Sequence, residues 1–278
     1  MTSGIPASVL ADAVGTLRAA GCVFAEDEAA VLGAAADDVT ALGTLVRRRA
    51  AGEPLEQVVG FADFCGIRIR LRPNVFVPRV RSALMVRLAA EEAARASLPG
   101  HSLSHRAGGA QGTPVVVDLC CGSGALGLAV RHRVPGADLY AADVDPVAVA
   151  CARDNFGADG PRVFAGHLFD ALPAGLRGRI DVLIANVPYV ATRHLPLLPA
   201  EARLYEPPTA LDGGADGLDV FRSVVAEAPA WLAPGGVLFS EITGAQSEAA
   251  TAALRAAGLR PAVHHDPDLE ATAIQGRR

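Results

Sequence analysis

The chain has 278 residues, 51% of them hydrophobic and 20% charged, and carries a formal net charge of −5 at pH 7. This length suits two globular domains, and the acidic balance gives no overall attraction to nucleic acid or to an anionic membrane. Five cysteines without a C-x-x-C pair predict neither a disulfide framework nor a zinc site, so we expect no bound metal. No apolar run reaches the roughly 18 residues of a membrane span, and the N-terminus lacks the layout of a signal peptide, so we expect a cytoplasmic protein.

The N-terminal part of the chain has the pattern of amphipathic helices. Apolar residues recur there at three-to-four spacing, at Val9, Leu10, Ala13, Val14 and Leu17, and the stretches 26–36 and 41–51 continue the pattern. From residue 58 the period changes to two, because apolar residues alternate with arginines over 67–72, which is typical of a strand in a hairpin. We therefore predict a helical domain over 1–56 and a linking β-hairpin over 57–78.

The remaining residues, 79–278, are predicted to form one α/β domain. A helical stretch over 82–96 precedes a segment, 98–113, whose glycines, serines and histidines are typical of a flexible linker or loop. After Pro114 short β-branched runs alternate with helical stretches, which indicates βαβ units and a parallel sheet. Strands are expected at 115–117, 138–142, 162–165, 181–185 and 237–242, helices at 125–133, 147–156, 218–232 and 247–257, and a closing hairpin at 260–264 and 271–275.

A glycine-rich turn follows the first strand of this domain. Residues 115–124 read Val-Val-Val-Asp-Leu-Cys-Cys-Gly-Ser-Gly. Gly122 and Gly124 allow unusual dihedral angles and a close approach of a ligand, and the helix that follows offers unpaired N–H groups. This turn is compatible with two cofactors that contain a nucleoside: S-adenosylmethionine and, because Gly127 completes the pattern G-x-G-x-x-G, a nicotinamide dinucleotide.

Two aspartates stand at the carboxyl ends of neighbouring predicted strands. Ligands of open α/β sheets bind at this edge, so Asp118 and Asp143 are candidate cofactor residues. The carboxylate of Asp143 can accept hydrogen bonds from both hydroxyls of a ribose, which both cofactors carry. The structural alternatives are a turn or N-cap role for Asp118 and a helix cap before Pro146 for Asp143. The pair indicates a nucleoside and leaves the reaction open.

An apolar strand over 181–185 runs directly into the polar loop Asn186-Val187-Pro188-Tyr189. With this loop the chain resembles the bacterial glutamine N(5)-methyltransferases that modify the Gly-Gly-Gln loop of peptide chain release factors, whose motif is Asn-Pro-Pro-Tyr. The resemblance covers nearly the whole chain. It extends, in family order, to Gly52-Glu-Pro-Leu-Glu-Gln57, Val77-Pro-Arg79, Asp118–Gly124, Tyr205-Glu-Pro-Pro208, Ala210–Leu218 and Leu232-Ala-Pro-Gly-Gly236.

The resemblance implies a class I, Rossmann-like methyltransferase domain with a seven-stranded sheet and S-adenosylmethionine as the cofactor. Cofactor residues would be Asp118, Cys120, Cys121, Gly122, Ser123, Gly124, Asp143, Leu168 and Asn186. The catalytic residues would be the loop itself: Asn186 and the carbonyl of Val187 accept the two amide N–H groups of a glutamine, Pro188 is retained, and Tyr189 stacks on the planar group. The helical domain would bind a protein substrate such as a peptide chain release factor, with no membrane or nucleic-acid partner.

Several positions depart from the family pattern. Val187 replaces the first proline of the motif and adds an N–H group and freedom in φ. The segment Val80-Arg81-Ser82-Ala83 replaces Pro, an acidic residue, Thr and Glu, so an acidic segment has become basic. Cys120 and Cys121 occupy small-residue positions, and Leu168 stands where an aromatic often lies. We therefore predict a paralogous N-methyltransferase that modifies a protein glutamine, or alternatively a small molecule or another protein.

Other functions remain as alternatives. An NAD-dependent oxidoreductase would use the same glycine turn, but the sequence lacks an evident Tyr-Lys or His-based pair for hydride transfer and contains no lysine at all. Adenine-N(6) methylation of DNA is disfavoured by the acidic balance. An inactive adenosylmethionine-binding module is compatible with Val187 and the altered segment 80–83. His264-His265-Asp266 supplies too few ligands for a metal and is interpreted as a solvated turn.

Overall fold

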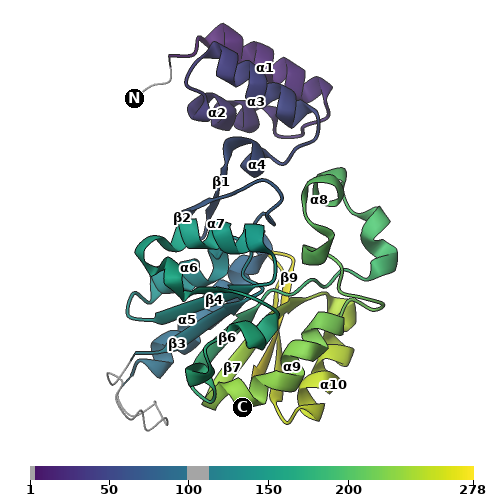
Figure 1. The fold of residues 1–278 in the computed structure, drawn as a ribbon. Helices are drawn as coiled ribbons and strands as arrows, with labels where there is room; N and C mark the ends of the chain where they lie inside the picture. Colours follow the sequence, from purple (N-terminus) through teal and green to yellow (C-terminus); the bar gives the residue numbers. More distant parts are fainter. Residues whose placement is uncertain (1–3, 99–112) are drawn as a thin grey trace.

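The computed structural model describes residues 4–98 and 113–278, so most of the predicted linker 98–113 lies outside the described residues. The chain forms a helical domain, a β-hairpin and a larger α/β domain, in that order (Figure 1). In the helical domain α1 (Ala7–Ala19), α2 (Ala25–Ala35) and α3 (Val39–Ala50) pack around a common core that includes Leu17, Leu32 and Leu42. The predicted three-to-four spacing therefore corresponds to buried faces of real helices.

A short connection joins the two domains. Helix α4 (Leu55–Val59) leads into the antiparallel pair β1 (Phe61–Phe64) and β2 (Ile67–Arg70). Ile69 is buried in the hairpin whereas the arginines beside it are exposed, as the alternating sequence predicts. The hairpin is tied to the α/β domain, because the carboxamide of Asn155 bonds both backbone groups of Arg70.

The α/β domain is built on one seven-stranded sheet with the order β5-β4-β3-β6-β7-β9-β8. The strands β3 to β7 are parallel, and β9 pairs antiparallel with both β7 and β8. Their bounds are β3 (Val115–Leu119), β4 (Asp138–Asp143), β5 (Val163–Ala165), β6 (Ile180–Ala185), β7 (Leu232–Ile242), β8 (Arg260–Asp266) and β9 (Ala271–Arg277). The prediction of a Rossmann-like sheet with a closing antiparallel hairpin is confirmed.

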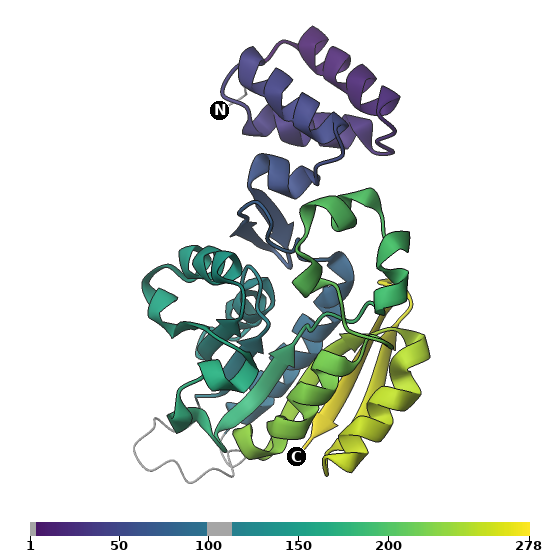
Figure 2. The same cartoon turned by 45° about the vertical axis from the view of Figure 1, so that its right-hand side comes forward.

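Helices cover both faces of this sheet (Figure 2). Helices α5 (Ala83–Ala96), α6 (Ala125–Arg133) and α7 (Pro146–Phe156) share one hydrophobic core with Val116 of β3, whereas α9 (Asp219–Trp231) and α10 (Ser247–Ala256) share a second core with Val115 and Val117. The alternation within β3 places a core on each face of the sheet. Because both faces are covered, ligands can approach the strands only from their ends.

Two features differ from the predicted elements. Strand β7 begins at Leu232, five residues before the predicted strand, because a bulge accommodates Pro234 and Gly235 opposite β6. Between β6 and α9 the chain makes an excursion with helix α8 (Ala200–Tyr205), for which the sequence predicted no element. The excursion reaches back toward the helical domain (Figures 1 and 2). Within the described ranges no helix combines the length and the apolar character that crossing a membrane requires.

Candidate functional site

A cavity of about 450 Å³ lies at the carboxyl ends of the parallel strands and brings the predicted site residues together. Its walls include Asp118, Cys120, Cys121, Gly122, Ser123, Asp143, Leu168, Asn186, Val187, Pro188 and Tyr189. Of the residues that sequence analysis placed in the site, Gly124 alone does not line the cavity. These residues lie at or just after the carboxyl ends of four strands, β3 to β6, so the parallel sheet is what assembles them.

The glycine turn between β3 and α6 is closely packed at two of its glycines. Gly124 has φ of 77°, and a Cβ there would lie 2.8 Å from the ring of Phe156. A Cβ on Gly127 would lie 2.9 Å from the Cβ of Asp118 and 3.0 Å from Leu139. Helix α6 can therefore approach the sheet closely only because these positions lack side chains. Gly124 thus shapes the turn from behind, which explains its absence from the cavity wall.

Two residues at predicted cofactor positions adopt left-handed backbone conformations without being glycine. Cys120 has φ of 57° and Leu168 has φ of 42°. Such conformations cost of order 1–3 kcal/mol and gather where function demands a particular backbone path. Burial raises the pKa of Cys120 and of Cys121 well above the usual value of a thiol, which disfavours the reactive thiolate form. Cys120 and Cys121 therefore act as packing residues whose backbone forms the turn.

The two aspartates organise the turn from opposite sides. Asp118 is only 1% exposed and accepts a hydrogen bond of 2.8 Å from the amide of Gly127, so its contact is the one expected for a turn residue. Burial raises the pKa of Asp118 to about 7. Asp143 accepts bonds from the amides of Gly122 at 2.8 Å and Asp145 at 2.9 Å, one to each oxygen. Each oxygen retains a further lone pair that can accept from a hydroxyl.

The loop that follows β6 presents an unused hydrogen-bond acceptor. The side-chain oxygen of Asn186 is buried and makes no hydrogen bond to the residues that the structure describes. Buried polar atoms are nearly always paired, and an exception at a cavity wall is a place for a ligand's donor. Val187 is only 2% exposed and belongs to the same hydrophobic core as Leu218 and Phe221. Its side chain anchors the loop where the family's proline ring would have stiffened it.

A glycine-rich loop, 211–218, packs against the backbone of the loop 186–190. The amide of Val190 donates to Leu211 at 3.0 Å, and the amide of Gly213 donates to Val190 at 2.8 Å. A Cβ on Gly213 would lie 2.6 Å from the carbonyl oxygen of Pro188, and one on Gly217 would lie 2.2 Å from that of Tyr189. The loop 211–218 can therefore approach the backbone of Pro188 and Tyr189 this closely only because residues 213 and 217 are glycines. The segment 210–218 is part of the resemblance to the family, but the sequence did not predict its contact with the loop 186–190.

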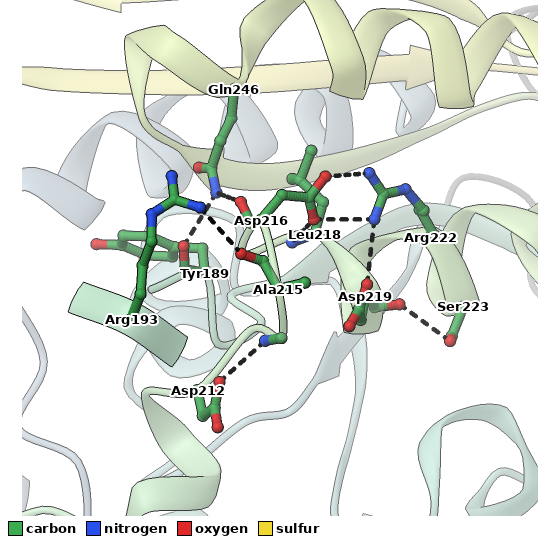
Figure 3. Close-up of polar contacts among 11 residues, drawn as sticks. Tyr189, Arg193, Asp212, Ala215, Asp216, Leu218, Asp219, Arg222, Ser223 and Gln246 are labelled. Atoms are coloured by element: carbon green, nitrogen blue, oxygen red, sulfur yellow. Dashed lines mark hydrogen bonds and ion pairs between the residues drawn. The ribbon is translucent and has the colours of Figure 1, made fainter. Parts of the chain in front are cut away.

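Gln246 connects the two loops (Figure 3). Its Nε2 donates to the carbonyl oxygens of Tyr189 at 3.0 Å and Asp216 at 3.1 Å, and its Oε1 accepts from the amide and hydroxyl of Thr243. Asp216 is held further by Arg222, whose Nη1 donates to its Oδ1 at 3.0 Å. Gln246 lies outside every predicted motif. Only the folded chain shows that its amide spans two segments more than 25 residues apart.

The altered segment 80–83 also reaches the site. The hydroxyl of Tyr189 accepts a bond of 2.6 Å from Nη2 of Arg81 and donates one of 2.6 Å to Oε1 of Glu241. Nε of Arg81 donates to the same carboxylate oxygen at 2.7 Å, and the hydroxyl of Ser82 donates to Oε2 at 2.6 Å. Glu241, which sequence analysis missed, is 3% exposed and lies on β7. Glu241 thus holds three side chains next to the cavity in place: those of Arg81, Ser82 and Tyr189.

A second ion pair, between Arg79 and Glu206, also lines the cavity. Nη2 of Arg79 donates to Oε1 of Glu206 at 2.6 Å, and the amide of Val77 donates to the same oxygen at 3.1 Å. Oε2 of Glu206 is buried and makes no bond to the described part of the chain, and burial raises the pKa of this carboxyl. Glu206 directly follows α8, so the pair fastens the excursion to the segment that precedes α5.

The helical domain contacts the cavity wall through α8. Arg49 on α3 pairs with Glu28 at 2.6 Å and with Glu201 on α8 at 2.7 Å. The carboxamide of Gln57 donates to the carbonyl oxygens of Val75 at 3.1 Å and Tyr205 at 3.2 Å. Because Glu201 also lines the cavity, the helical domain is in direct contact with a residue of the cavity wall.

Comparisons with known proteins identify relatives along most of the chain. The family model "Methyltransferase small domain" matches residues 109–202. A release factor glutamine methyltransferase of Geobacter sulfurreducens is 37% identical over 76% of this chain and 68% of that protein, and one of Bordetella pertussis is 37% identical over 81% and 77%. A 4-amino-L-phenylalanine/4-methylamino-L-phenylalanine methyltransferase of Streptomyces pristinaespiralis is 35% identical over 77% and 69%.

A solved structure shares the fold at much lower sequence identity. The catalytic domain of hMettl16, in complex with the MAT2A 3′UTR hairpin 6, matches with a TM-score of 0.55 and 12% identity. The match covers 90% of this chain and 81% of that chain. It supports the class I fold described above.

Proposed function

Because the chain belongs to the release factor glutamine methyltransferase family, we propose that it transfers a methyl group from S-adenosylmethionine to a nitrogen, first of all to the side-chain amide of a glutamine in a protein such as a peptide chain release factor. The observation that carries the proposal is the buried, unpaired oxygen of Asn186 beside Tyr189 in the cavity wall. An acceptor in that place suits a substrate that offers an N–H group.

The residues at the other end of the cavity fit S-adenosylmethionine. A Cβ on Gly122 would meet no atom within 4 Å, so there is open space over the turn. Asp143 would accept from the ribose hydroxyls, the backbone of 120–123 would face the amino acid part, and Leu168 would lie against the adenine. Asp118 would act by holding the turn through Gly127. When bound, the cofactor supplies an electrophilic methyl group on a sulfonium sulfur.

Orientation is the main catalytic resource of such a site. The lone pair of an amide nitrogen is delocalised, so the nitrogen reacts only when its face is aligned with the methyl group. Asn186 and the carbonyl of Val187 would accept its two N–H groups, and the ring of Tyr189 would form a wall against the planar group. These acceptors are fixed before the reaction, so they stabilise developing positive charge at little cost of reorganisation. The nitrogen becomes acidic once it is methylated and loses its proton without a dedicated base.

The domain arrangement supports a macromolecular acceptor. We propose that residues 1–56 recognise the protein substrate, that 57–78 link the domains and that 79–278 perform the transfer. The contacts of Arg49 and Gln57 with α8 place the helical domain next to the cavity wall, where a substrate bound to it could extend a glutamine inward.

A second candidate is methylation of a small amine. The 35% identity to the amino acid methyltransferase of Streptomyces pristinaespiralis favours it, as does Arg81 in the cavity wall where the family carries an acidic segment. A free amino acid offers a carboxylate that a guanidinium can bind. The two candidates share Asn186 and Tyr189 and differ in the acceptor.

Intact-mass analysis of acceptors after incubation with S-adenosylmethionine tests the proposal. A gain of one methyl group on a glutamine-bearing peptide of a release factor, lost with Asn186→Ala, is the expected result. Methylation of 4-amino-L-phenylalanine with no change in the release factors would select the second candidate. Calorimetry provides the check on the cofactor: tight binding of NAD with no binding of S-adenosylmethionine would overturn both.

A further inference from the structure

The phenol of Tyr189 is held in a closed triangle of hydrogen bonds. Arg81 donates to its oxygen, the phenol donates to Glu241, and Arg81 donates to Glu241 in turn, with the three distances between 2.6 and 2.7 Å. Charge-assisted bonds of this length are about twice as strong as neutral ones. The triangle fixes the hydroxyl from two directions, since one partner requires it as acceptor and the other as donor.

The backbone of Tyr189 is already fixed independently. Gln246 donates to its carbonyl oxygen, and Gly217 lies so close that no Cβ fits between them. The remaining freedom of the residue is rotation of the side chain about χ1 and χ2. The bonds to the hydroxyl remove that freedom, so they determine where the plane of the ring lies.

The charges in the triangle balance one another. Glu241 is buried, and Arg81 is its only cationic partner among the described residues, so removal of Arg81 would leave a buried carboxylate held there by hydroxyl groups alone. The side chain of Arg81 is 44% exposed and lines the cavity, so it stands between the solvent and the buried carboxylate. Its guanidinium lies 5.9 Å from the centre of the Tyr189 ring, at the edge of the wall. Residue 81 therefore acts at the acceptor end of the site.

We propose that Arg81 is a positioning residue for methyl transfer, which holds the Tyr189 ring in the plane against which the acceptor's planar nitrogen group lies. The proposal rests on the proposed function of the cavity. It explains why a basic residue is compatible with a site whose relatives carry an acidic segment there: in this chain Glu241 and the phenol bind the arginine, and the arginine in turn orients the phenol. A planar amide or aryl amine would depend on that orientation more than a flexible alkyl amine.

A double-mutant cycle tests the proposal by kinetics. Arg81→Gln is expected to lower kcat/KM by about tenfold to a hundredfold, the effect of losing one or two charge-assisted bonds, with most of the loss in kcat. In a Tyr189→Phe background the same change should cost less than about threefold, because the hydroxyl through which Arg81 acts is gone. Equal losses in both backgrounds would show that Arg81 acts independently of the ring.

Arg81→Lys and a charge-neutral pair of substitutions guard against simple misfolding. Lysine keeps the charge but lacks the planar fork, so an intermediate rate is expected. The double variant Arg81→Gln with Glu241→Gln leaves no unpaired charge and should unfold near the temperature of the parent while it remains slow. Arg87→Gln, which removes an exposed arginine of α5 outside the cavity, is the matched control and should retain the parental rate.

A readout without turnover separates this proposal from the proposed function. The chain has three tyrosines, so ring-labelled tyrosine gives three NMR signals, and Tyr189→Phe assigns one of them. Arg81→Gln should shift or broaden the signal of Tyr189 and leave those of Tyr140 and Tyr205 unchanged. An unchanged Tyr189 signal would overturn the positioning role of Arg81 even if methyl transfer is found. Absence of transfer to every acceptor would overturn the proposed methyltransferase function, and the spectrum would still show whether Arg81 holds the Tyr189 ring.

Discussion

Gly217→Ala is the most direct perturbation of the contacts that support the loop 186–190, the proposed catalytic loop. The new Cβ would lie 2.2 Å from the carbonyl oxygen of Tyr189 and 2.5 Å from Nε2 of Gln246. Neither neighbour can rotate away, because the first is backbone and the second is held by two donors and two acceptors around its amide. The loop 186–190 must therefore move, together with the ring of Tyr189.

The size of the effect follows from two contributions. Gly217 has φ of 80°, and placing alanine in a left-handed conformation costs about 1–2 kcal/mol. Overpacking against fixed backbone adds about 1–3 kcal/mol. Gly258 has φ of 78° but no atom within 4 Å of its Cβ position, so Gly258→Ala carries the conformational contribution alone.

Denaturant unfolding and steady-state methyl transfer measure the two contributions. We expect Gly217→Ala to lose about 2–5 kcal/mol of unfolding free energy and Gly258→Ala about 1–2 kcal/mol. A displacement of the loop by roughly an ångström should lower kcat by about a hundredfold in Gly217→Ala only. Equal stability and equal rates in the two variants would refute the view that the loop is supported by contact with Gly217.

Three further predictions concern charge and burial. Burial raises the pKa of Asp118 to about 7 from a usual 3.8, so its contribution to stability is present below about pH 4 and is lost as the pH rises to about 7. Unfolding free energy should fall over that interval by on the order of 4 kcal/mol relative to Asp118→Asn, and a parallel pH dependence in the two proteins would contradict this. Glu201→Gln weakens the pair with Arg49 and should raise KM for a protein acceptor about two- to fivefold without affecting a free amine, and steady-state kinetics with both acceptors would reveal any other pattern. Cys120 and Cys121 should resist alkylation at pH 8 in the folded protein and react after unfolding, because the pKa of both thiols is raised; mass spectrometry that finds labelling before unfolding would contradict this.

Features with a short sequence range were predictable. The β-branched run around Val116 and the apolar run before Asn186 predicted the strands. Because the carboxyl ends of parallel strands meet at one edge, the pattern alone placed Asp118, Asp143 and the glycine turn at the site, whereas the resemblance to the family supplied the other cavity residues. Gly124 was predicted to contact the cofactor, but it packs against Phe156. A sequence pattern alone cannot distinguish a glycine needed for close packing from one needed for ligand approach.

Features that depend on contacts between distant segments were not predictable. Arg81 and Glu241 are 160 residues apart, and nothing in either local sequence indicates that they meet at Tyr189. The same holds for Gln246, which acts on the backbone and not on a motif side chain. Burial of a carboxylate and the partner that compensates it are properties of the packed chain alone.

Val187 links the reactive loop to the interior of the domain. Its side chain belongs to a core whose other members include Phe221 and Val224 on α9, and these two do not line the cavity. A substitution that changes the side-chain volume at Phe221 or Val224 is expected to alter the packing of Val187 and so to shift its neighbours Asn186 and Pro188. Selection for a new methyl acceptor can therefore proceed through interior substitutions that leave every cavity side chain in place, a route that surveys of the cavity wall would overlook.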